Sequence, residues 1–250
     1  MPDQPQHDDN STSQLRYSVV VPVYNEDVNI TPFCEAAKSQ LNDDFEMLVC
    51  YDFDEDKTLP VLASIPASEK PTNIRLIRND LGQGVRYAIE AGFRAATTPV
   101  VICVMCDMSD DFDDIEKMIG LIEDGATVVS ASRHMKGGRQ VCKPSLKSFL
   151  SRCAGRSLYW LAGVPTRDPT NCFKAYRREF LDVTPIADKT EGFNLGLELT
   201  VKAHFSGGRI DEIPTVWHDR SAGESRFRLF AWMPQYLRWY FWAIRKRWLG

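Results

Sequence analysis

Residues 100–111 read VVICVMCDMSDD, a continuous apolar run that passes directly into an acidic loop. A run of this kind, rich in β-branched and aliphatic residues, predicts a strand covered on both faces. Two earlier segments share the pattern: residues 17–23 (YSVVVPV) lead into residues 24–26 (YNE), and residues 45–51 (FEMLVCY) lead into residues 52–56 (DFDED). A buried strand followed by a polar turn is therefore the repeating unit of the chain.

Helical spacing of apolar residues separates these strands. Residues 27–40, 84–96 and 113–124 carry apolar side chains three or four positions apart, and short apolar runs at residues 74–77 and 127–130 predict two more strands. This alternation predicts an α/β fold whose mostly parallel, Rossmann-like sheet has helices on both faces. Ligands of such sheets bind at the carboxyl ends of the strands, so we expect the polar clusters there to form the site.

The remaining parts of the chain are less regular. We expect helices at residues 147–161 and 198–205 and a strand at residues 210–216. The first 14 residues are polar and acidic and lack the apolar region of a signal peptide, so a flexible tail over residues 1–15 is expected.

Composition limits the classes of function. A chain of 250 residues is long enough for one large α/β domain or at most two small ones. The net charge of -4 gives no basic footprint, so no nucleic-acid partner is expected. Seven scattered cysteines, an odd number, favour free thiols in a reducing compartment, and hence a cytoplasmic protein.

The spacing of residues argues against several other kinds of binding site. In a dinucleotide fingerprint starting at Gly82, the third glycine would fall at Tyr87, and no Walker A loop is present. Cys103 and Cys106 lie three apart in a predicted strand and so face opposite sides of the sheet, which makes chelation by this pair unfavourable. The four histidines show no metal-ligand spacing.

The acidic strand ends suit a divalent cation, because Mg²⁺ binds one or two carboxylates together with substrate phosphates. Asp107 lies at a strand tip, where we favour this function, whereas Asp113 and Asp114 open a helix and are interpreted as caps. Later in the chain, Arg220 and Arg226 bracket a glycine-containing loop. That loop suits phosphate binding, and a solvated surface loop is an equally good interpretation.

Taken in order, these segments resemble family 2 glycosyltransferases with a GT-A fold, above all the dolichol- or polyprenyl-phosphate mannosyltransferase type. The motifs that carry the resemblance are VPVYNE at 21–26, DFDEDKT at 52–58, GQG at 82–84, MCDMS at 105–109, SRH at 132–134, GG at 137–138, DPTNCFK at 168–174, EIP at 212–214, DR at 219–220 and GESR at 223–226. The likeness covers roughly residues 17 to 228.

The resemblance implies an inverting transferase that moves a sugar from a nucleotide-sugar to a polyprenyl phosphate with the help of Mg²⁺ or Mn²⁺. The implied donor-binding residues are Pro22, Tyr24, Glu26, Asp52, Asp54, Gln83 and Asp107. The implied acceptor-phosphate residues are Arg133, Lys147 and Ser151. The implied metal ligands are Asp107 and Ser109. The implied catalytic residues are Asp107, Arg220 and Arg226, with Asp168 as the candidate base if the acceptor is a hydroxyl group.

Some positions depart from the family pattern. Met105 stands where the family has the first Asp of D-x-D, Tyr51 and Phe53 replace the first Asp and the Gly of D-D-G-S, and Cys172 replaces the Gly of S-G-F. The change at Met105 removes one expected metal ligand. We therefore expect Asp107 to bind metal together with the donor diphosphate, and only when donor is present.

Two alternatives stay open. The acceptor can be a glycan or another hydroxyl compound of cell-surface polysaccharide synthesis. The change at Met105 also allows a degenerate protein that binds a nucleotide-sugar without turnover.

The C-terminal segment, residues 227–250, is rich in aromatic residues with Arg and Lys between them. It lacks the uncharged apolar run of ~20 residues that a membrane span needs. We expect a catalytic domain over residues 16–226 followed by an amphipathic helix that holds the protein on the cytoplasmic face of a membrane. Packing on the catalytic domain, or a homodimer contact, is the alternative for this helix.

Overall fold

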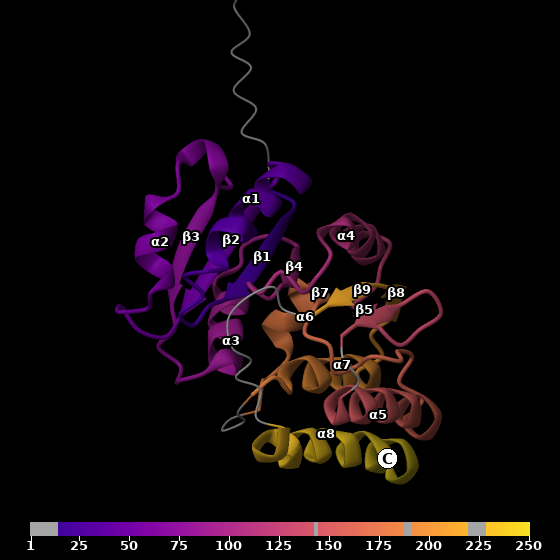
Figure 1. The fold of residues 1–250 in the computed structure, drawn as a ribbon. Helices are drawn as coiled ribbons and strands as arrows, with labels where there is room; N and C mark the ends of the chain where they lie inside the picture. Colours follow the sequence, from indigo (N-terminus) through magenta and orange to yellow (C-terminus); the bar gives the residue numbers. More distant parts are fainter. Residues whose placement is uncertain (1–14, 143–144, 188–191, 220–228) are drawn as a thin grey trace, which may run out of the picture.

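The apolar runs form one seven-stranded sheet in the computed structural model, which describes residues 15–142, 145–187, 192–219 and 229–250 (Figure 1). The strand order is β3-β2-β1-β4-β7-β5-β8. The bounds of these strands are β1 Tyr17–Pro22, β2 Phe45–Tyr51, β3 Ile74–Arg78, β4 Val100–Cys103, β5 Val128–Ser132, β7 Lys174–Arg177 and β8 Ile210–Pro214. A separate parallel pair consists of β6 Arg139–Val141 and β9 Val216–His218.

The helices fall between the strands largely where apolar spacing places them. Their bounds are α1 Ile30–Gln40, α2 Thr58–Ser64, α3 Val85–Ala95, α4 Ile115–Glu123, α5 Leu146–Ala162, α6 Arg178–Val183, α7 Leu195–Phe205 and α8 Leu229–Leu249. Two short 3-10 turns, η1 Ala67–Glu69 and η2 Phe112–Asp114, complete the described elements.

The central strand β1 shows why helices cover both faces of the sheet. Val19 and Val21 pack into a core that includes residues of α1 and α4, whereas Val20 packs into a second core with α3 and α7. Because side chains of a strand alternate between faces, a fully apolar strand needs a cover on each side. The predicted class, a mostly parallel α/β sheet of the GT-A type with helices on both faces, is confirmed.

One strand runs against the others. β7 is antiparallel to both of its neighbours, β4 and β5. The apolar pattern of the sequence predicts no strand at this position. Lys174 at the start of β7 pairs with Cys103 at the end of β4. The reversal therefore brings residues 168–172, which precede β7, to the sheet edge where β1, β2 and β4 end.

The last helix packs against the domain. Trp239 and Ala243 of α8 are buried with Leu158 of α5 and Val201 of α7. Among the described residues, no helix combines the length and apolarity needed to cross a bilayer. The expected tail, residues 1–15, and the expected boundary at residue 226 lie outside the described residues, apart from residue 15 itself.

Candidate active site

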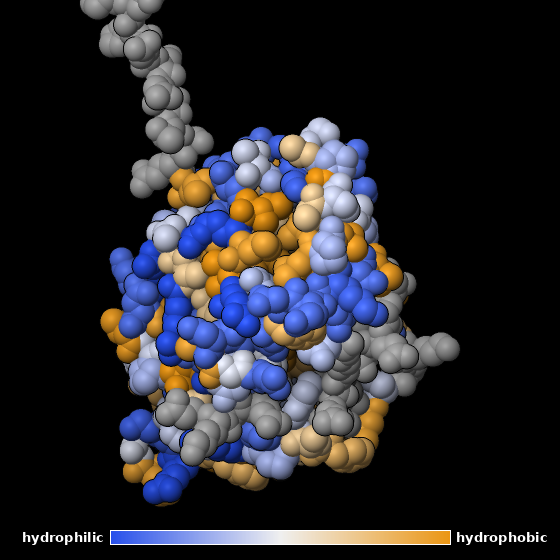
Figure 2. Space-filling view, turned by 90° about the vertical axis from the view of Figure 1, so that its left-hand side faces the viewer, coloured by the Kyte–Doolittle hydropathy of each residue, from blue (hydrophilic) through white to orange (hydrophobic). Residues whose placement is uncertain are grey.

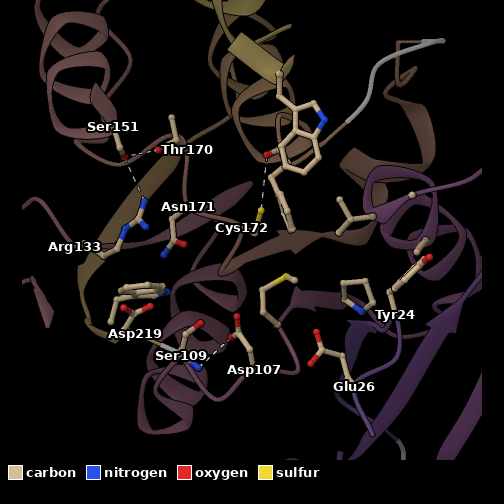
Figure 3. Close-up of a pocket in the computed structure, with 18 of the residues that line it drawn as sticks. Tyr24, Glu26, Asp107, Ser109, Arg133, Ser151, Thr170, Asn171, Cys172 and Asp219 are labelled. Carbon is tan, nitrogen blue, oxygen red and sulfur yellow. Dashed lines mark hydrogen bonds between the residues drawn. The ribbon is translucent and has the colours of Figure 1, made fainter. Parts of the chain in front are cut away.

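A cavity of about 830 Å³ opens at the carboxyl ends of β1, β2 and β4. Its walls come from the loops that follow these strands, from residues 170–172 before β7, and from one side of α5 and of α8. Figure 3 shows Tyr24 and Glu26 on one side of this space, Arg133 and Ser151 on the other, and Asp107 with Ser109 between them. The cavity thus joins segments that are far apart in the sequence.

Two carboxylates, the buried Asp56 and the half-buried Asp52, shape the wall expected to bind the donor. Asp56 accepts hydrogen bonds from the backbone amides of Asn25, at 3.1 and 3.0 Å, and Thr58, at 2.8 Å, and so fixes the loop after β1. Asp52 accepts from the amide of Gly84 at 2.8 Å and from the side chain of Asn79 at 2.7 Å. These bonds hold the loops that contribute Pro22, Tyr24, Glu26, Asp52 and Gly84 to the cavity.

Two implied donor-binding residues lie elsewhere. Asp54 is exposed and forms an ion pair with Arg78 at 3.3 Å, outside the cavity lining. Gln83 is exposed and also absent from the lining, whereas its neighbour Gly84 contributes to it. The turn after β2 and the turn before α3 direct these side chains toward solvent, so the structure does not support donor contact by either residue.

The acidic centre of the cavity lies just beyond β4. Asp107 Oδ1 accepts a hydrogen bond from the Ser109 amide at 3.2 Å, and Met108 between them has a left-handed φ of 59°. Burial, and then the nearby charge of Asp107, raises the pKa of Asp110 to about 7. Carboxyl groups are therefore crowded at this turn, where the charged form of Asp110 is disfavoured beside Asp107. Asp110 itself does not line the cavity.

The donor set fits a hard cation only in part. Asp107 and Ser109 offer a carboxylate and a hydroxyl oxygen, the type of ligand that Mg²⁺ and Mn²⁺ accept. The described residues hold no group of three or more His, Cys, Asp or Glu side chains that could bind a metal without further ligands. A metal here needs oxygen atoms from a bound phosphate or from water, as the loss at Met105 leads us to expect.

Arg133, paired with Asp168 behind it, lies on the side of the cavity opposite Tyr24 and Glu26. Arg133 Nε donates to Asp168 Oδ2 at 2.6 Å, one terminal nitrogen donates to Oδ1 at 2.9 Å, and the Arg133 amide adds a bond at 3.1 Å. The same terminal nitrogen reaches Ser151 Oγ at 3.4 Å, and Ser151 is 2.7 Å from Thr170 Oγ1. Arg133, Ser151 and Thr170 line the cavity, whereas Asp168 lies behind them.

The geometry argues against the role suggested for Asp168 as a base. Asp168 is fully buried, and Arg133 engages both of its oxygens. Burial by itself would raise the pKa of Asp168, but the charge and hydrogen bonds of Arg133 outweigh it and hold the pKa well below its usual range. A carboxylate so stabilised accepts a proton poorly, so Asp168 is a positioning residue for Arg133.

A buried lysine holds the loop that carries Asp168. Lys174 is fully buried, and its ammonium donates to the backbone carbonyls of Asp168, Pro169 and Asn171. Burial lowers the pKa of Lys174 to about 8, against the opposing charge of Asp168. The loop is thus held by the first residue of β7, for which the sequence predicted no role beyond its place in the motif at 168–174.

Three implied residues cannot be placed. Lys147 belongs to α5, but its side chain is not described. Arg220 and Arg226 lie outside the described residues.

The first turns of α8 form a wall of the cavity that was not predicted from the sequence. Trp232, Met233 and Tyr236 line the cavity together with Phe193 and Cys172. The Trp232 and Phe193 rings meet edge to face at 5.5 Å. The sequence feature that could have indicated this wall is the high aromatic content of residues 227–250. The contact with Phe193, however, depends on tertiary packing.

Gly192 provides a test of this wall. It has a φ of +82°, and a Cβ built on it would lie 2.4 Å from the Trp232 ring. We expect Gly192→Ala to lower the free energy of unfolding by about 1–3 kcal/mol, through backbone strain and displacement of the ring.

Urea unfolding measures the change, and Gly120→Ala is the matched control. Gly120 lies inside α4, and no atom lies within 4 Å of the added Cβ. The free energy of unfolding of this variant should therefore rise by about 0.5–1 kcal/mol. Equal unfolding midpoints for Gly192→Ala and the parent would contradict the packing of Trp232.

Comparison with known proteins adds independent information. The model of glycosyl transferase family 2 matches residues 18–184. The dolichyl-phosphate hexose transferase of Haloferax volcanii is 31% identical over 215 residues, covering 86% of this chain and 87% of that protein. The dolichol-phosphate mannosyltransferase of Pyrococcus furiosus is 26% identical over 222 residues, covering 86% of this chain but 60% of the relative, so this chain spans about three fifths of its length.

A solved structure shares the fold. The glucosyl-3-phosphoglycerate synthase of Mycobacterium tuberculosis, in complex with Mn²⁺, UDP-glucose and phosphoglyceric acid, has a TM-score of 0.66. It is 17% identical, and the match covers 92% of this chain and 80% of that one. At this identity the likeness supports the architecture alone.

Proposed function

Because the chain belongs to glycosyl transferase family 2 and is a glycosyltransferase, we propose that its cavity transfers a sugar from a nucleoside diphosphate sugar to a polyprenyl phosphate. The observation that carries the proposal is that one cavity holds both an acidic centre at Asp107 and a buried arginine, Arg133, fixed by Asp168. The names of both relatives, each a transferase of a dolichyl or dolichol phosphate, agree with this acceptor class.

The donor would lie along the wall of Pro22, Tyr24, Glu26 and Asp52, with its diphosphate near Asp107. Asp107 and Ser109 would hold Mg²⁺ or Mn²⁺ together with that diphosphate. A divalent cation there offsets the charge of the departing nucleoside diphosphate. Arg220 and Arg226 are proposed to close over the same phosphates.

The acceptor phosphate would bind Arg133, Ser151 and Thr170. A forked guanidinium held by a carboxylate presents its remaining donors in a fixed direction, which suits a phosphate. A phosphate oxygen is already anionic and needs no base to attack the anomeric carbon. A single in-line attack, with the nucleoside diphosphate leaving from the opposite side, would invert the configuration at that carbon. A hydroxyl acceptor needs a base, and Asp168 is too strongly stabilised as a carboxylate to serve.

The test is transfer by the full chain from a panel of nucleoside diphosphate sugars to a polyprenyl phosphate, compared with the corresponding polyprenol, in the presence of Mn²⁺. We expect transfer to the phosphate and none to the alcohol. Comparable transfer to the alcohol would assign the enzyme to hydroxyl acceptors. If every donor of the panel is left intact with both acceptors, the proposed reaction is wrong.

We further propose that residues 227–250 keep the enzyme at the cytoplasmic face of a membrane, where a lipid phosphate is presented. The exposed aromatic residues of α8 support this location, among them Phe241 and Trp248. A homodimer contact through the same helix is the competing proposal.

A further inference from the structure

The small parallel pair of β6 and β9 turns one face toward the cavity. Gln140 of β6 lies directly opposite Trp217 of β9, and both line the cavity. Their neighbours Arg139 and His218 are exposed and do not line it. Because side chains of a strand alternate between faces, Asp219, two residues beyond Trp217, lines the cavity as well. This face therefore presents an amide, an indole ring and a carboxyl group.

Backbone hydrogen bonds fix β9 at both ends. The amide of Thr215, just before the strand, donates to the Ser132 carbonyl at 3.2 Å. The amide of His218, the last residue of the strand, donates to the Ser109 carbonyl at 3.1 Å. Trp217 lies between these two bonds, so its backbone is held between the end of β5 and the acidic turn after β4.

The wall of β6 and β9 thus lies between the two charged centres of the cavity. Figure 3 shows Asp219 beside Ser109 and below Arg133. The turn that leads from Arg133 into β6 is closely packed, since a Cβ on Gly138 would clash with the Ser132 carbonyl oxygen. Both strands are therefore held against the segment that carries the arginine.

The sugar of the donor has to lie in this part of the cavity. In the proposed reaction its diphosphate is near Asp107 and the acceptor phosphate is at Arg133, and the anomeric carbon lies between them. A tryptophan ring offers an apolar face to the C–H groups of a sugar, and an amide both donates to and accepts from hydroxyl groups. Among the described residues, none makes a hydrogen bond with the Gln140 side chain, so its amide is available to a ligand.

Apolar surface alone would not mark a sugar site. Figure 2, which faces the side of α2 and β3, shows hydrophobic residues among strongly hydrophilic ones, although neither element contributes a residue to the cavity lining. Trp217 differs because its ring shares a cavity face with the amide of Gln140. That combination of an aromatic face and a hydrogen-bonding group is what a pyranose ring requires.

The charge of the lining bears on which sugar fits. Four carboxyl groups line the cavity, those of Glu26, Asp52, Asp107 and Asp219. Of the described residues in the lining, Arg133 alone is basic, and it is already paired with Asp168. A sugar that carries its own carboxylate would meet like charge at Asp219, which is unfavourable.

We propose that Trp217 and Gln140 bind the sugar of the donor, and that their wall selects a neutral pyranose over a uronic acid. The ring covers one face of the pyranose while the amide bonds its hydroxyl groups, which keeps the anomeric carbon between Asp107 and Arg133. The inference rests on the proposed function, which places a sugar between the two phosphates.

The experiment is isothermal titration calorimetry of the full chain with Mn²⁺, using UDP-glucose against UDP and GDP-mannose against GDP. Trp217→Leu should raise the Kd of the nucleotide sugar that the parent binds about tenfold, because the ring contact is lost. The Kd of the matching nucleoside diphosphate should stay within about twofold of the parent value.

Further variants separate the ring from the amide. Gln140→Leu should raise the Kd of the nucleotide sugar about three- to tenfold through the lost hydrogen bonds, and Trp217→Phe, which keeps a ring, should restore most of the affinity. The matched controls are Arg139→Leu and His218→Leu, on the opposite face of the same strands, which should bind both ligands like the parent.

The choice of sugar is tested on the parent. It should bind UDP-glucuronic acid, or GDP-mannuronic acid if the base is guanine, about tenfold more weakly than the neutral counterpart. Stronger binding of the uronic acid would overturn the inference.

Two further results would overturn it. One is an equal loss of nucleotide sugar and nucleoside diphosphate in Trp217→Leu and Gln140→Leu, which would assign these residues to the nucleotide. The other is unchanged affinity of both variants for the nucleotide sugar. The titrations contain no acceptor, so a failure of transfer to polyprenyl phosphate leaves them intact. A parent that binds no nucleotide sugar would instead overturn the proposed function, and this inference with it.

Discussion

Asp107→Asn is expected to lower the rate of sugar transfer by about a thousandfold while leaving the fold intact. Asparagine keeps an oxygen that can accept the hydrogen bond from the Ser109 amide, so the turn after β4 should survive. The variant loses the carboxylate charge that would hold a divalent cation at the donor diphosphate. This loss should raise the activation free energy by several kcal/mol. The measurement is kcat with saturating Mn²⁺ and donor.

The control is Asp113→Asn, an identical chemical change at an exposed carboxylate in η2, outside the cavity. It should keep nearly full activity. Mn²⁺ binding, followed by the electron paramagnetic resonance of the free ion, adds a second readout. The parent should bind Mn²⁺ tightly only with a nucleoside diphosphate present, and tight binding without one would show that this chain supplies ligands beyond Asp107 and Ser109.

Much of this site could be predicted because it lies at strand ends. The apolar run ending at residue 106 identifies a buried strand, and the parallel sheet then places its acidic turn beside the turns after residues 23 and 51. The cavity accordingly gathers Pro22, Glu26 and Asp107. Loop geometry was beyond the sequence pattern, since a turn of one or two residues decides whether a side chain such as Asp54 faces the ligand or pairs with Arg78.

The features of the site that were not predicted depend on contacts between residues far apart in the sequence. Asp168 and Arg133 are 35 residues apart, and their ion pair depends on the antiparallel insertion of β7, which apolar spacing did not predict. This pairing holds Asp168 as a buried carboxylate against Arg133, which argues against its use as a base. Likewise, α8 was expected at a membrane surface, with packing on the catalytic domain or a homodimer contact as the alternative, but no part in the cavity was predicted for it. Trp232 packs against Phe193 and contributes to the cavity wall.

Asp168→Asn is expected to lower the free energy of unfolding at pH 7 by about 3–5 kcal/mol, because it leaves Arg133 as a buried charge without its partner. Urea unfolding measures the loss. Asp182→Asn removes an exposed ion pair with Arg178 and is the control, with an expected change below about 1 kcal/mol. The guanidinium of the Asp168 variant should also lose its fixed orientation, raising the KM for a polyprenyl phosphate more than it lowers kcat.

The pH dependence of the stability difference between the parent and Asp168→Asn distinguishes the loss of an ion pair from the loss of packing. The pKa of Asp168 is depressed in the folded protein, so its contribution is complete above the unfolded pKa of about 3.9 and is lost as the pH falls toward the folded value. The advantage of the parent over Asp168→Asn should therefore narrow below about pH 4. A double-mutant cycle with Arg133→Met tests the coupling between the two residues. In the Arg133→Met background, Asp168→Asn should lower the free energy of unfolding much less than it does in the parent. Strictly additive losses would mean that the two residues stabilise the protein independently and that Asp168 does not position Arg133.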